Sequence, residues 1–341
     1  MPKLSVILPV YNTEKYIKEA VDSILNQTYK DFELIVLNDA STDGTLGILQ
    51  QYQDTRLKVI TNEQNLKVVK TLNKGLDLAQ GEYIARMDAD DISHPQRFEK
   101  QIQFLEQHPD VDFVGSWVQT FGSESNIMRA ATEHEHIKVR LFFLNPIFHP
   151  VVMFRRESFE KHGLRYDEHF TNAEDYGMWV KAIDHIKFAN VPEILLKYRV
   201  HSFNVSVIKA SNRAVLDEIH YNMYQYFLKK LGILSYTEHE LLMHRKLGLV
   251  EVEALNLNQL NEYLQWLKKL VLANNQSGYF DKKFFNMVVL SYLLYVVRKA
   301  KPSGPAFKLG LKTFNSIFNI ADLVSFVVSR ARVNLMRPDT F

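Results

Sequence analysis

Three aspartates, Asp88, Asp90 and Asp91, lie within four positions and form the most chemically conspicuous group in this chain. They follow residues 83–87, a short and mostly apolar run that predicts a largely buried strand of an α/β sheet. In an open α/β sheet, ligands bind beyond the carboxyl ends of the strands, and carboxylates this close repel each other unless a cation lies between them. With no Cys or His beside them, these oxygens favour Mg²⁺ or Mn²⁺, which proteins often share with substrate phosphates. The residues alone leave a simpler alternative, in which Asp91 caps a helix that begins near residues 94–95.

Length and composition limit the classes of protein to consider. The chain has 341 residues, 46% of them hydrophobic, which is enough for one large domain with an appendage or for two domains. A formal charge of +2 is too close to balance to favour a nucleic-acid partner. The absence of cysteine excludes disulfides and thiolate metal sites and is compatible with the cytoplasm. We expect neither a signal peptide nor a membrane-spanning helix, because the longest apolar runs, at 287–297 and 317–328, are short and interrupted by polar residues.

The elements that must position the aspartates alternate between strand and helix up to about residue 118, a pattern typical of a parallel sheet covered on both faces. The predicted strands are residues 4–10, 32–37, 57–61, 82–87 and 111–118. Polar residues directly follow three of them and should line one edge of the sheet, where a nucleotide would bind: Tyr11, Asn12, Asp39 and Asp88. Neither Gly-x-x-x-x-Gly-Lys nor Gly-x-Gly-x-x-Gly follows the first strand, which disfavours a P-loop hydrolase or a Rossmann dehydrogenase.

Four segments, residues 4–12, 23–29, 32–45 and 88–91, resemble the family 2 glycosyltransferases in their order and separation. The resemblance covers about residues 3–206. It implies the A-type glycosyltransferase fold, an α/β architecture with a Rossmann-like mixed sheet. It also implies that the donor is a nucleotide-diphosphate sugar, with UDP as the expected nucleotide.

The resemblance assigns roles to the residues of the donor side. Asp39 would accept a hydrogen bond from the base, uracil N3–H in the case of UDP, although it could instead cap the turn toward residues 41–42. Asp88 and Asp90 would hold the metal ion that bridges the diphosphate. His201 would be a third metal ligand or a phosphate contact, with an ordinary loop histidine as the alternative. Pro9 and Tyr11 would form the wall beside the base, although a Tyr after a strand could instead belong to the core, and Asn12 would contribute to the nucleotide site at the same edge of the sheet.

One departure from the family pattern concerns two lysines. Relatives usually carry Gly two residues after the position of Asn65, where this chain has Lys67, and Lys70 follows closely. Both lysines could contact the donor phosphates, or they could belong to a solvated helix start.

The acceptor side involves a second pair of carboxylates, Glu174 and Asp175, in the first turn of a predicted helix. A helix N-terminus stabilises ionised carboxylates, which is also the ordinary reason why acids occur there. The match to the family's Glu-Asp-Tyr motif assigns Asp175 as the general base and Glu174 as a neighbour that orients the acceptor or the loop. His149 and Trp179 would contact the acceptor sugar, although His149 could instead be held by backbone hydrogen bonds.

The strand signals stop beyond residue 211. Helices are predicted at residues 214–228, 238–249, 257–272, 280–297 and 307–331, so we expect a catalytic domain at 1–210 and an all-helical C-terminal region at 211–341. The final stretch is rich in basic residues: Arg298, Lys299, Lys301, Lys308, Lys312, Arg330, Arg332 and Arg337. This region could lie on an anionic membrane surface, or it could form a lid or a homodimer interface.

These features predict an inverting, metal-assisted glycosyltransferase that moves a hexose to a hydroxyl of a cell-surface glycan or a polyprenyl-linked acceptor. Its place would be the cytoplasm or the inner face of the plasma membrane. One alternative is a nucleotidyltransferase, which usually has a Gly-rich, Lys/Arg-containing loop that residues 9–12 lack. The other is a non-catalytic assembly subunit that binds nucleotide sugars without turnover.

Overall fold

The computed structural model describes residues 1–341 except 171–172, 202–212, 301–303, 320–321, 324–325 and 328–341. The chain folds into two compact units. The first comprises Met1–His134 and Ile147–Ser211, and the second comprises Glu135–Pro146 and Asn212–Phe341. The division at residue 211 lies next to the expected domain boundary, but residues 135–146 belong with the C-terminal helices, which the sequence did not indicate.

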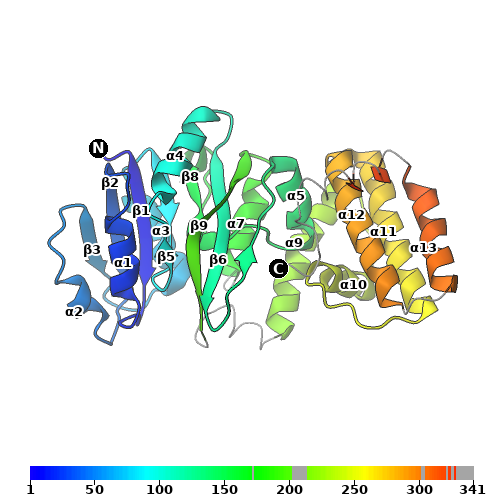
Figure 1. Ribbon diagram of the computed structural model, residues 1–341, viewed down its shortest axis with the longest axis horizontal. Coiled ribbons are helices and arrows are strands. Elements are labelled where there is room, and N and C mark those ends of the chain that lie inside the picture. Colours follow the sequence, from blue (N-terminus) through cyan, green and yellow to red (C-terminus); the bar gives the residue numbers. More distant parts are fainter. Residues whose placement is uncertain (171–172, 202–212, 301–303, 320–321, 324–325, 328–341) are drawn as a thin grey trace. The chain divides into compact units, whose positions relative to one another are not determined.

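The first unit is built on one mixed sheet with the strand order β3-β2-β1-β4-β8-β6-β9-β5, and β7 pairs with β6 (Figure 1). The strands are β1 (Leu4–Val10), β2 (Phe32–Asn38), β3 (Leu57–Thr61), β4 (Tyr83–Arg86), β5 (Ile92–Ser93), β6 (Phe113–Gly122), β7 (Ile127–Met128), β8 (Met153–Arg155) and β9 (Phe188–Val200). The first four are mutually parallel, whereas β8 runs antiparallel to both β4 and β6. The carboxyl ends of β1, β2 and β4 therefore meet at one edge of the sheet.

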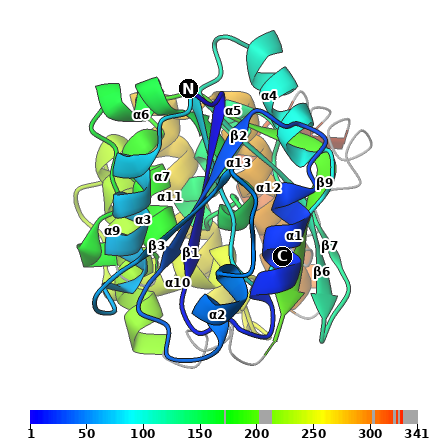
Figure 2. The ribbon, with the colours of Figure 1, turned by 90° about the vertical axis from the view of Figure 1, so that its left-hand side faces the viewer.

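Helices cover both faces of this sheet. They are α1 (Ile17–Leu25), α2 (Thr45–Leu49), α3 (Lys67–Leu78), α4 (Arg97–Gln107), α6 (Arg156–Lys161) and α7 (Glu174–Ala182). Figure 2 shows α1 and α3 on opposite faces of the parallel strands. Right-handed crossovers explain this, because the chain passes from β1 to β2 in one direction along the sheet and from β3 to β4 in the opposite direction. The predicted α/β alternation is confirmed.

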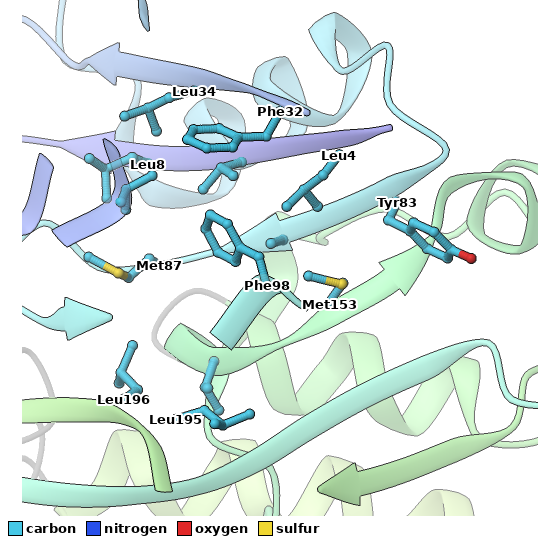
Figure 3. Close-up of a cluster of buried hydrophobic side chains, with 14 of the residues drawn as sticks. Leu4, Leu8, Phe32, Leu34, Tyr83, Met87, Phe98, Met153, Leu195 and Leu196 are labelled. Atoms are coloured by element: carbon cyan, nitrogen blue, oxygen red, sulfur yellow. The ribbon is translucent and has the colours of Figure 1, made fainter. Parts of the chain in front are cut away.

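A buried apolar cluster holds the parallel strands against α1 and α4 (Figure 3). Phe98 of α4 packs edge-on against Phe32 of β2, with the ring centroids 5.6 Å apart. Leu4 and Leu8 of β1 and Met153 of β8 are fully buried in the same cluster. Burying each such side chain stabilises the fold by about 1.5–3 kcal/mol, so the loops beyond β1, β2 and β4 project from a rigid base.

The second unit is helical in the part that the structure describes. Its helices are α5 (His134–Phe143, which starts one residue before the unit does), α9 (Arg213–Lys230), α10 (Glu238–Gly248), α11 (Leu257–Ser277), α12 (Lys282–Lys299) and α13 (Gly304–Ile317) (Figure 1). Capping boxes begin α10 and α11, in which Thr237 pairs with Glu240 and Asn256 with Gln259. The prediction of C-terminal helices is confirmed.

The predicted helix 307–331 is wrong in its extent. Helix α13 ends at Ile317, and Asn319 and Asp322 then each accept a hydrogen bond from the other's backbone N–H, at 3.0 and 2.8 Å. This reciprocal pair begins a new turn and so interrupts the helix. Lys301, Arg330, Arg332 and Arg337 lie outside the described residues. Among those described, no helix combines the length and the apolar character needed to cross a bilayer.

Candidate active site

A pocket of about 660 Å³ opens at the carboxyl ends of β1, β2 and β4. Eight of the predicted donor-side and metal-binding residues line it: Pro9, Tyr11, Asn12, Asp39, Lys67, Asp88, Asp90 and His201. They come from five separate segments of the chain that the fold brings to one edge of the sheet. The pocket therefore gathers carboxylates, a lysine, an imidazole and an aromatic ring around one space.

The loops that form this pocket contain left-handed backbone at residues other than glycine. Asn12 has φ 51°, Ala40 has φ 57° and Lys67 has φ 69°. Such a conformation costs a residue with a side chain about 1–2 kcal/mol. Hydrogen bonds between the first two loops offset this cost, because the backbone N–H of Asn12 donates to Ser41 Oγ at 3.0 Å and that of Thr42 donates to Asn12 Oδ1 at 2.8 Å. The two loops thus form one preorganised wall.

Asp39 is buried, and three hydrogen bonds from neighbouring residues hold its carboxylate in place. Its carboxylate accepts hydrogen bonds from Asn62 Nδ2 at 2.8 Å and from the backbone N–H groups of Leu66 at 2.8 Å and Lys67 at 3.0 Å. The alternative that Asp39 caps the turn toward residues 41–42 is wrong, since it binds the start of α3 instead. An ionised carboxylate can accept about four hydrogen bonds, so Asp39 retains capacity for a donor in the pocket.

The structure separates the two predicted lysines. Lys67 lines the pocket, and its backbone has the left-handed conformation that Gly favours. Lys70 is not among the residues that line the pocket, and its Nζ lies 3.3 Å from Glu168. The expected contact of Lys70 with a donor phosphate is therefore not supported.

The three aspartates that follow β4 have different partners. Both carboxylate oxygens of Asp88 bind the guanidinium of Arg86, and Asp90 Oδ2 lies 3.0 Å from His201 Nε2. Asp91 is buried and accepts a hydrogen bond from the backbone N–H of Arg199 at 2.8 Å. Asp91 thus anchors the end of β9, and the alternative that it caps the next helix is wrong.

The electrostatics of this group show excess negative charge. Burial raises the pKa of Asp90, and the charge of Asp88 raises it further, although the hydrogen bond from His201 opposes the change. Burial and the charges of Asp88 and Asp90 also raise the pKa of Asp91 well above its usual value. A cation near Asp88 and Asp90 would relieve this repulsion.

The residues present fit a hard divalent cation that takes part of its ligands from a substrate. Asp88, Asp90 and His201 all line the pocket and offer oxygen and imidazole ligands. Within the described ranges, no three Asp, Glu, His or Cys side chains are placed as a ready-made metal cluster. Mg²⁺ and Mn²⁺ sites of this kind are usually completed by phosphate oxygens and water.

The second pair of carboxylates belongs to the first turn of α7, where Glu174 is buried and Asp175 is half-buried. Burial raises the pKa of Tyr166 above its usual range, the charges of Asp175, Glu174 and Asp88 raise it further, and Arg86 opposes the shift. Tyr166 is therefore within electrostatic reach of Asp88 and of both carboxylates of α7.

The sequence did not single out Arg86 or Tyr166. One signal could have identified Arg86: it is a charged residue between Ala85 and Met87 in a strand predicted to be buried, and arginine is almost never fully buried unless it is paired. Tyr166 stands in a loop without a comparable signal.

The two expected acceptor contacts need correction. Trp179 is fully buried and packs against Phe113 with the ring centroids 4.8 Å apart, so it is a core residue and the prediction of a sugar contact is wrong. His149 is also buried, and its Nε2 lies 2.8 Å from the hydroxyl of Tyr166. The protein itself therefore holds this imidazole, and a sugar contact is not supported.

Comparison with known proteins gives a consistent result. The family model described as Glycosyl transferase family 2 matches residues 5–163. The O-antigen biosynthesis glycosyltransferase WbnJ of Escherichia coli is 34% identical over 241 residues, covering 68% of this chain and 92% of WbnJ. The amylovoran biosynthesis glycosyltransferase AmsE of Erwinia amylovora is 30% identical over 241 residues, covering 68% of this chain and 89% of AmsE.

Among solved structures, residues 1–349 of S. aureus TarS in complex with UDP-GlcNAc superimpose with a TM-score of 0.58. The sequence identity is 20%, and the match covers 92% of this chain and 90% of that one. The likeness confirms the predicted A-type glycosyltransferase fold with its mixed sheet.

Proposed function

Because this chain belongs to glycosyl transferase family 2 and is a glycosyltransferase, we propose that it moves a hexose from UDP to a hydroxyl of a cell-surface glycan or polyprenyl-linked acceptor, with inversion. The observation that supports this most is the pocket at one edge of the sheet that brings Asp39, Asp88, Asp90 and His201 together. WbnJ and AmsE are named for the biosynthesis of surface polysaccharides, which favours an acceptor of this kind.

Recognition of the base would depend on Asp39. An ionised carboxylate can only accept hydrogen bonds, so it suits a base that presents an imino N–H, as uracil and guanine do. Cytosine and adenine present an acceptor at the corresponding edge and would repel it. Asn62 and the backbone of Leu66 and Lys67 fix the carboxylate before the donor binds, which reduces the entropy lost on binding. Tyr11 is half-exposed and offers a flat wall beside the base.

The diphosphate would lie toward Asp88, Asp90 and His201, which would hold a Mn²⁺ or Mg²⁺ ion. When bound, such an ion neutralises charge that develops on the departing diphosphate. The protein's own contribution is to keep these side chains in place. His201 stacks on Tyr16 with the centroids 5.0 Å apart, and Asp88 is held by Arg86.

Asp175 would act as the general base. It would remove the proton from the acceptor hydroxyl while that oxygen forms a bond to the anomeric carbon and the bond from this carbon to the diphosphate oxygen breaks. A single displacement of this kind inverts the anomeric centre and needs no covalent intermediate. Both carboxylates lie in the first turn of α7, at the positive end of the helix dipole.

The decisive experiment incubates the purified protein with a panel of nucleotide sugars and measures free nucleotide, with Mn²⁺ or with EDTA. The TarS complex contains UDP-GlcNAc, so UDP sugars are the first donors to test. We expect Mn²⁺-dependent release of UDP. Release of pyrophosphate from a nucleoside triphosphate and a sugar phosphate would instead indicate a nucleotidyltransferase. Protection from thermal unfolding by UDP sugars without any turnover would indicate a binding subunit.

Replacing Lys67 by Gly should weaken UDP binding without lowering the stability of the fold. Lys67→Gly should weaken UDP binding about tenfold, because a charge-assisted hydrogen bond to phosphate contributes about 1.5–3 kcal/mol. The free energy of unfolding should stay equal or rise by about 1 kcal/mol, since Gly relieves the left-handed strain but costs more chain entropy. Calorimetry with UDP and thermal unfolding measure the two effects.

Lys70→Ala is the matched control, since Lys70 pairs with Glu168 and does not line the pocket. It should leave UDP affinity unchanged. The backbone N–H of Lys67 still reaches Asp39 in the glycine variant, so any loss of affinity reports on the lysine side chain. Equal UDP affinity in Lys67→Gly and wild type would show that this side chain faces solvent and has no role in donor binding.

We also propose that α13 contacts an anionic membrane surface. Phe307 is 67% exposed and Leu311, one turn later, is 48% exposed, with Lys308 and Lys312 beside them and no acid in the helix. Replacing Phe307 and Leu311 by Ser, or both lysines by Glu, should release the protein from phosphatidylglycerol vesicles. In co-sedimentation, higher salt should release wild type in the same way.

Leu257→Ser provides the control for this surface, because Leu257 is 45% exposed but belongs to α11. It should leave vesicle binding unchanged. If the α13 variants still bind vesicles but change the oligomeric state in light scattering, the helix is a dimer interface instead. If they lose only transfer activity, it is a lid.

A further inference from the structure

Asn62 directly follows β3 and connects Asp39 to Lys74 of the neighbouring helix α3. Its buried side-chain amide bonds to both: Nδ2 donates to Asp39 Oδ1 at 2.8 Å, and Oδ1 accepts from Lys74 Nζ at 2.6 Å. The backbone N–H of Asn62 donates to the carbonyl of Asn38 at 2.9 Å, which continues the pairing of β3 with β2. A polar chain therefore leads from α3, through a residue fixed to the sheet, to the carboxylate in the pocket.

The two partners of Asn62 determine which way its amide faces. A lysine ammonium can only donate hydrogen bonds, and an ionised carboxylate can only accept them. If the amide turned by 180°, its oxygen would face Asp39 and its NH₂ group would face Lys74, so both hydrogen bonds would be lost. Lys74 thus favours the one orientation in which Asn62 donates to Asp39.

This orientation also determines which oxygen of Asp39 is available to a ligand. Oδ1 accepts two hydrogen bonds at 2.8 Å, one from Asn62 Nδ2 and one from the backbone N–H of Leu66. Oδ2 accepts one, from the backbone N–H of Lys67 at 3.0 Å. Because each carboxylate oxygen can accept about two hydrogen bonds, Oδ2 is the atom with capacity for a donor in the pocket that Asp39 lines.

We propose that Lys74 is a positioning residue for the choice of base: through Asn62 it holds Asp39 so that Oδ2 accepts the imino N–H of the donor's base. This inference rests on the proposed function of the site. Lys74 is not among the residues that line the pocket, so it acts on the base only through the other two side chains. It would therefore favour uracil and guanine over cytosine and adenine without touching any of them.

Lys74→Met removes the ammonium and is the first test. Calorimetry in EDTA with UDP and CDP, and with GDP and ADP as a second pair, compares imino and non-imino bases without a metal ion. Affinity for the preferred imino nucleotide should fall by about 3–10-fold, which is less than the loss of a direct hydrogen bond to a charged group would cause. Affinity for its non-imino counterpart should hardly change, so the preference falls by the same factor. Lys74→Arg keeps the charge and the donors and should restore most of the preference.

A double variant shows whether Lys74 acts through Asn62. In the Asn62→Leu background, Lys74→Met should cause no further loss of affinity or of preference, because the connection to Asp39 is already broken. Additive losses in the double variant would show that Lys74 acts on the donor by another route and would overturn the inference.

Lys58→Met is the matched control. Lys58 lies on β3 and its Nζ donates at 2.7 Å to the buried carboxylate of Glu33, but neither residue lines the pocket. Its loss should leave nucleotide affinity and base preference unchanged, whatever its effect on the midpoint of thermal unfolding. If Lys74→Met does not fold, Lys74→Gln gives the same test, because a neutral amide can donate or accept and no longer selects one orientation of Asn62.

Binding and transfer separate this inference from the proposed function. If wild type prefers an imino base and Lys74→Met retains that preference, the role of Lys74 is refuted while the function stands. The role is also refuted if wild type shows no preference in either pair of nucleotides, because there is then no choice of base for Lys74 to influence. If wild type releases no nucleotide from any sugar donor, the proposed function fails, and the nucleotide affinities of the variants still decide the role of Lys74.

Discussion

Replacing Asp175 by Asn is expected to lower the rate of sugar transfer by about 10²–10⁴-fold, the range usually attributed to general acid–base catalysis. Asn keeps the shape and most hydrogen bonds of Asp but cannot accept a proton. Donor binding should hardly change, because Asp175 is in the first turn of α7 and does not line the donor pocket. Initial rates of transfer to a hydroxyl acceptor and calorimetry with UDP and Mn²⁺ measure the two quantities separately.

Glu174→Gln is the matched variant, since it changes the adjacent carboxylate in the same way. We expect a milder loss of transfer, because Glu174 is buried and is proposed to support the site rather than to remove the proton. If Glu174→Gln abolished transfer and Asp175→Asn retained it, the two roles would be reversed. If both retained transfer, the base would have to be another residue.

The strands that carry the site could be predicted, because the apolar runs and the alternation of strands and helices both indicate them. The strands β1 and β3 begin and end where the apolar runs predicted, and β1 is buried along almost its whole length, as a continuous apolar run indicates. The carboxyl ends of β1, β2 and β4 had to meet at one edge of the sheet, so the pocket position of Tyr11, Asp39 and Asp88 followed from order alone.

The wrong assignments concern residues that lie one helical turn away from a candidate site residue. Trp179 is four residues after Asp175 and so on the same side of α7, but one turn further along, where it meets Phe113 in the core. Lys70 is one turn beyond Lys67, and its Nζ lies near Glu168 rather than in the pocket. Motif spacing does not determine how far along a helix a site extends.

The pairing of His149 with Tyr166 could not be predicted, because the two residues lie 17 positions apart and no local pattern links them. Lys67 is different: its departure from Gly was visible in the sequence, but only the structure shows that the backbone there still has the left-handed conformation that Gly favours.

Asp90 should show the largest effect on donor binding. Asp90→Asn or Asp90→Ala should remove the Mn²⁺-dependent part of UDP affinity, by more than about 100-fold, because losing a direct ligand exceeds the 10–100-fold cost of losing a group behind one. The fold should survive, since the side chain is 21% exposed at the pocket rather than part of the apolar core. Unchanged UDP affinity in Mn²⁺, measured by calorimetry, would refute the metal assignment, and His201→Ala should cause a smaller loss than either variant.

Asp90→Asn should stabilise the metal-free protein at neutral pH, although it weakens donor binding. Burial and repulsion from Asp88 raise the pKa of Asp90 in the folded state above its unfolded value, so the ionised carboxylate destabilises the fold at neutral pH. This cost is absent below the unfolded pKa, where Asp90 is protonated in both states, and it is fully present above the folded pKa. Asp90→Asn, without metal, should therefore unfold at a higher temperature than wild type at pH 7, and the difference should shrink as the pH falls through the folded pKa of Asp90. A lower unfolding temperature at pH 7 would show instead that the His201 pair stabilises the fold by more than the repulsion costs, and that Asp90 has a structural role as well as a functional one.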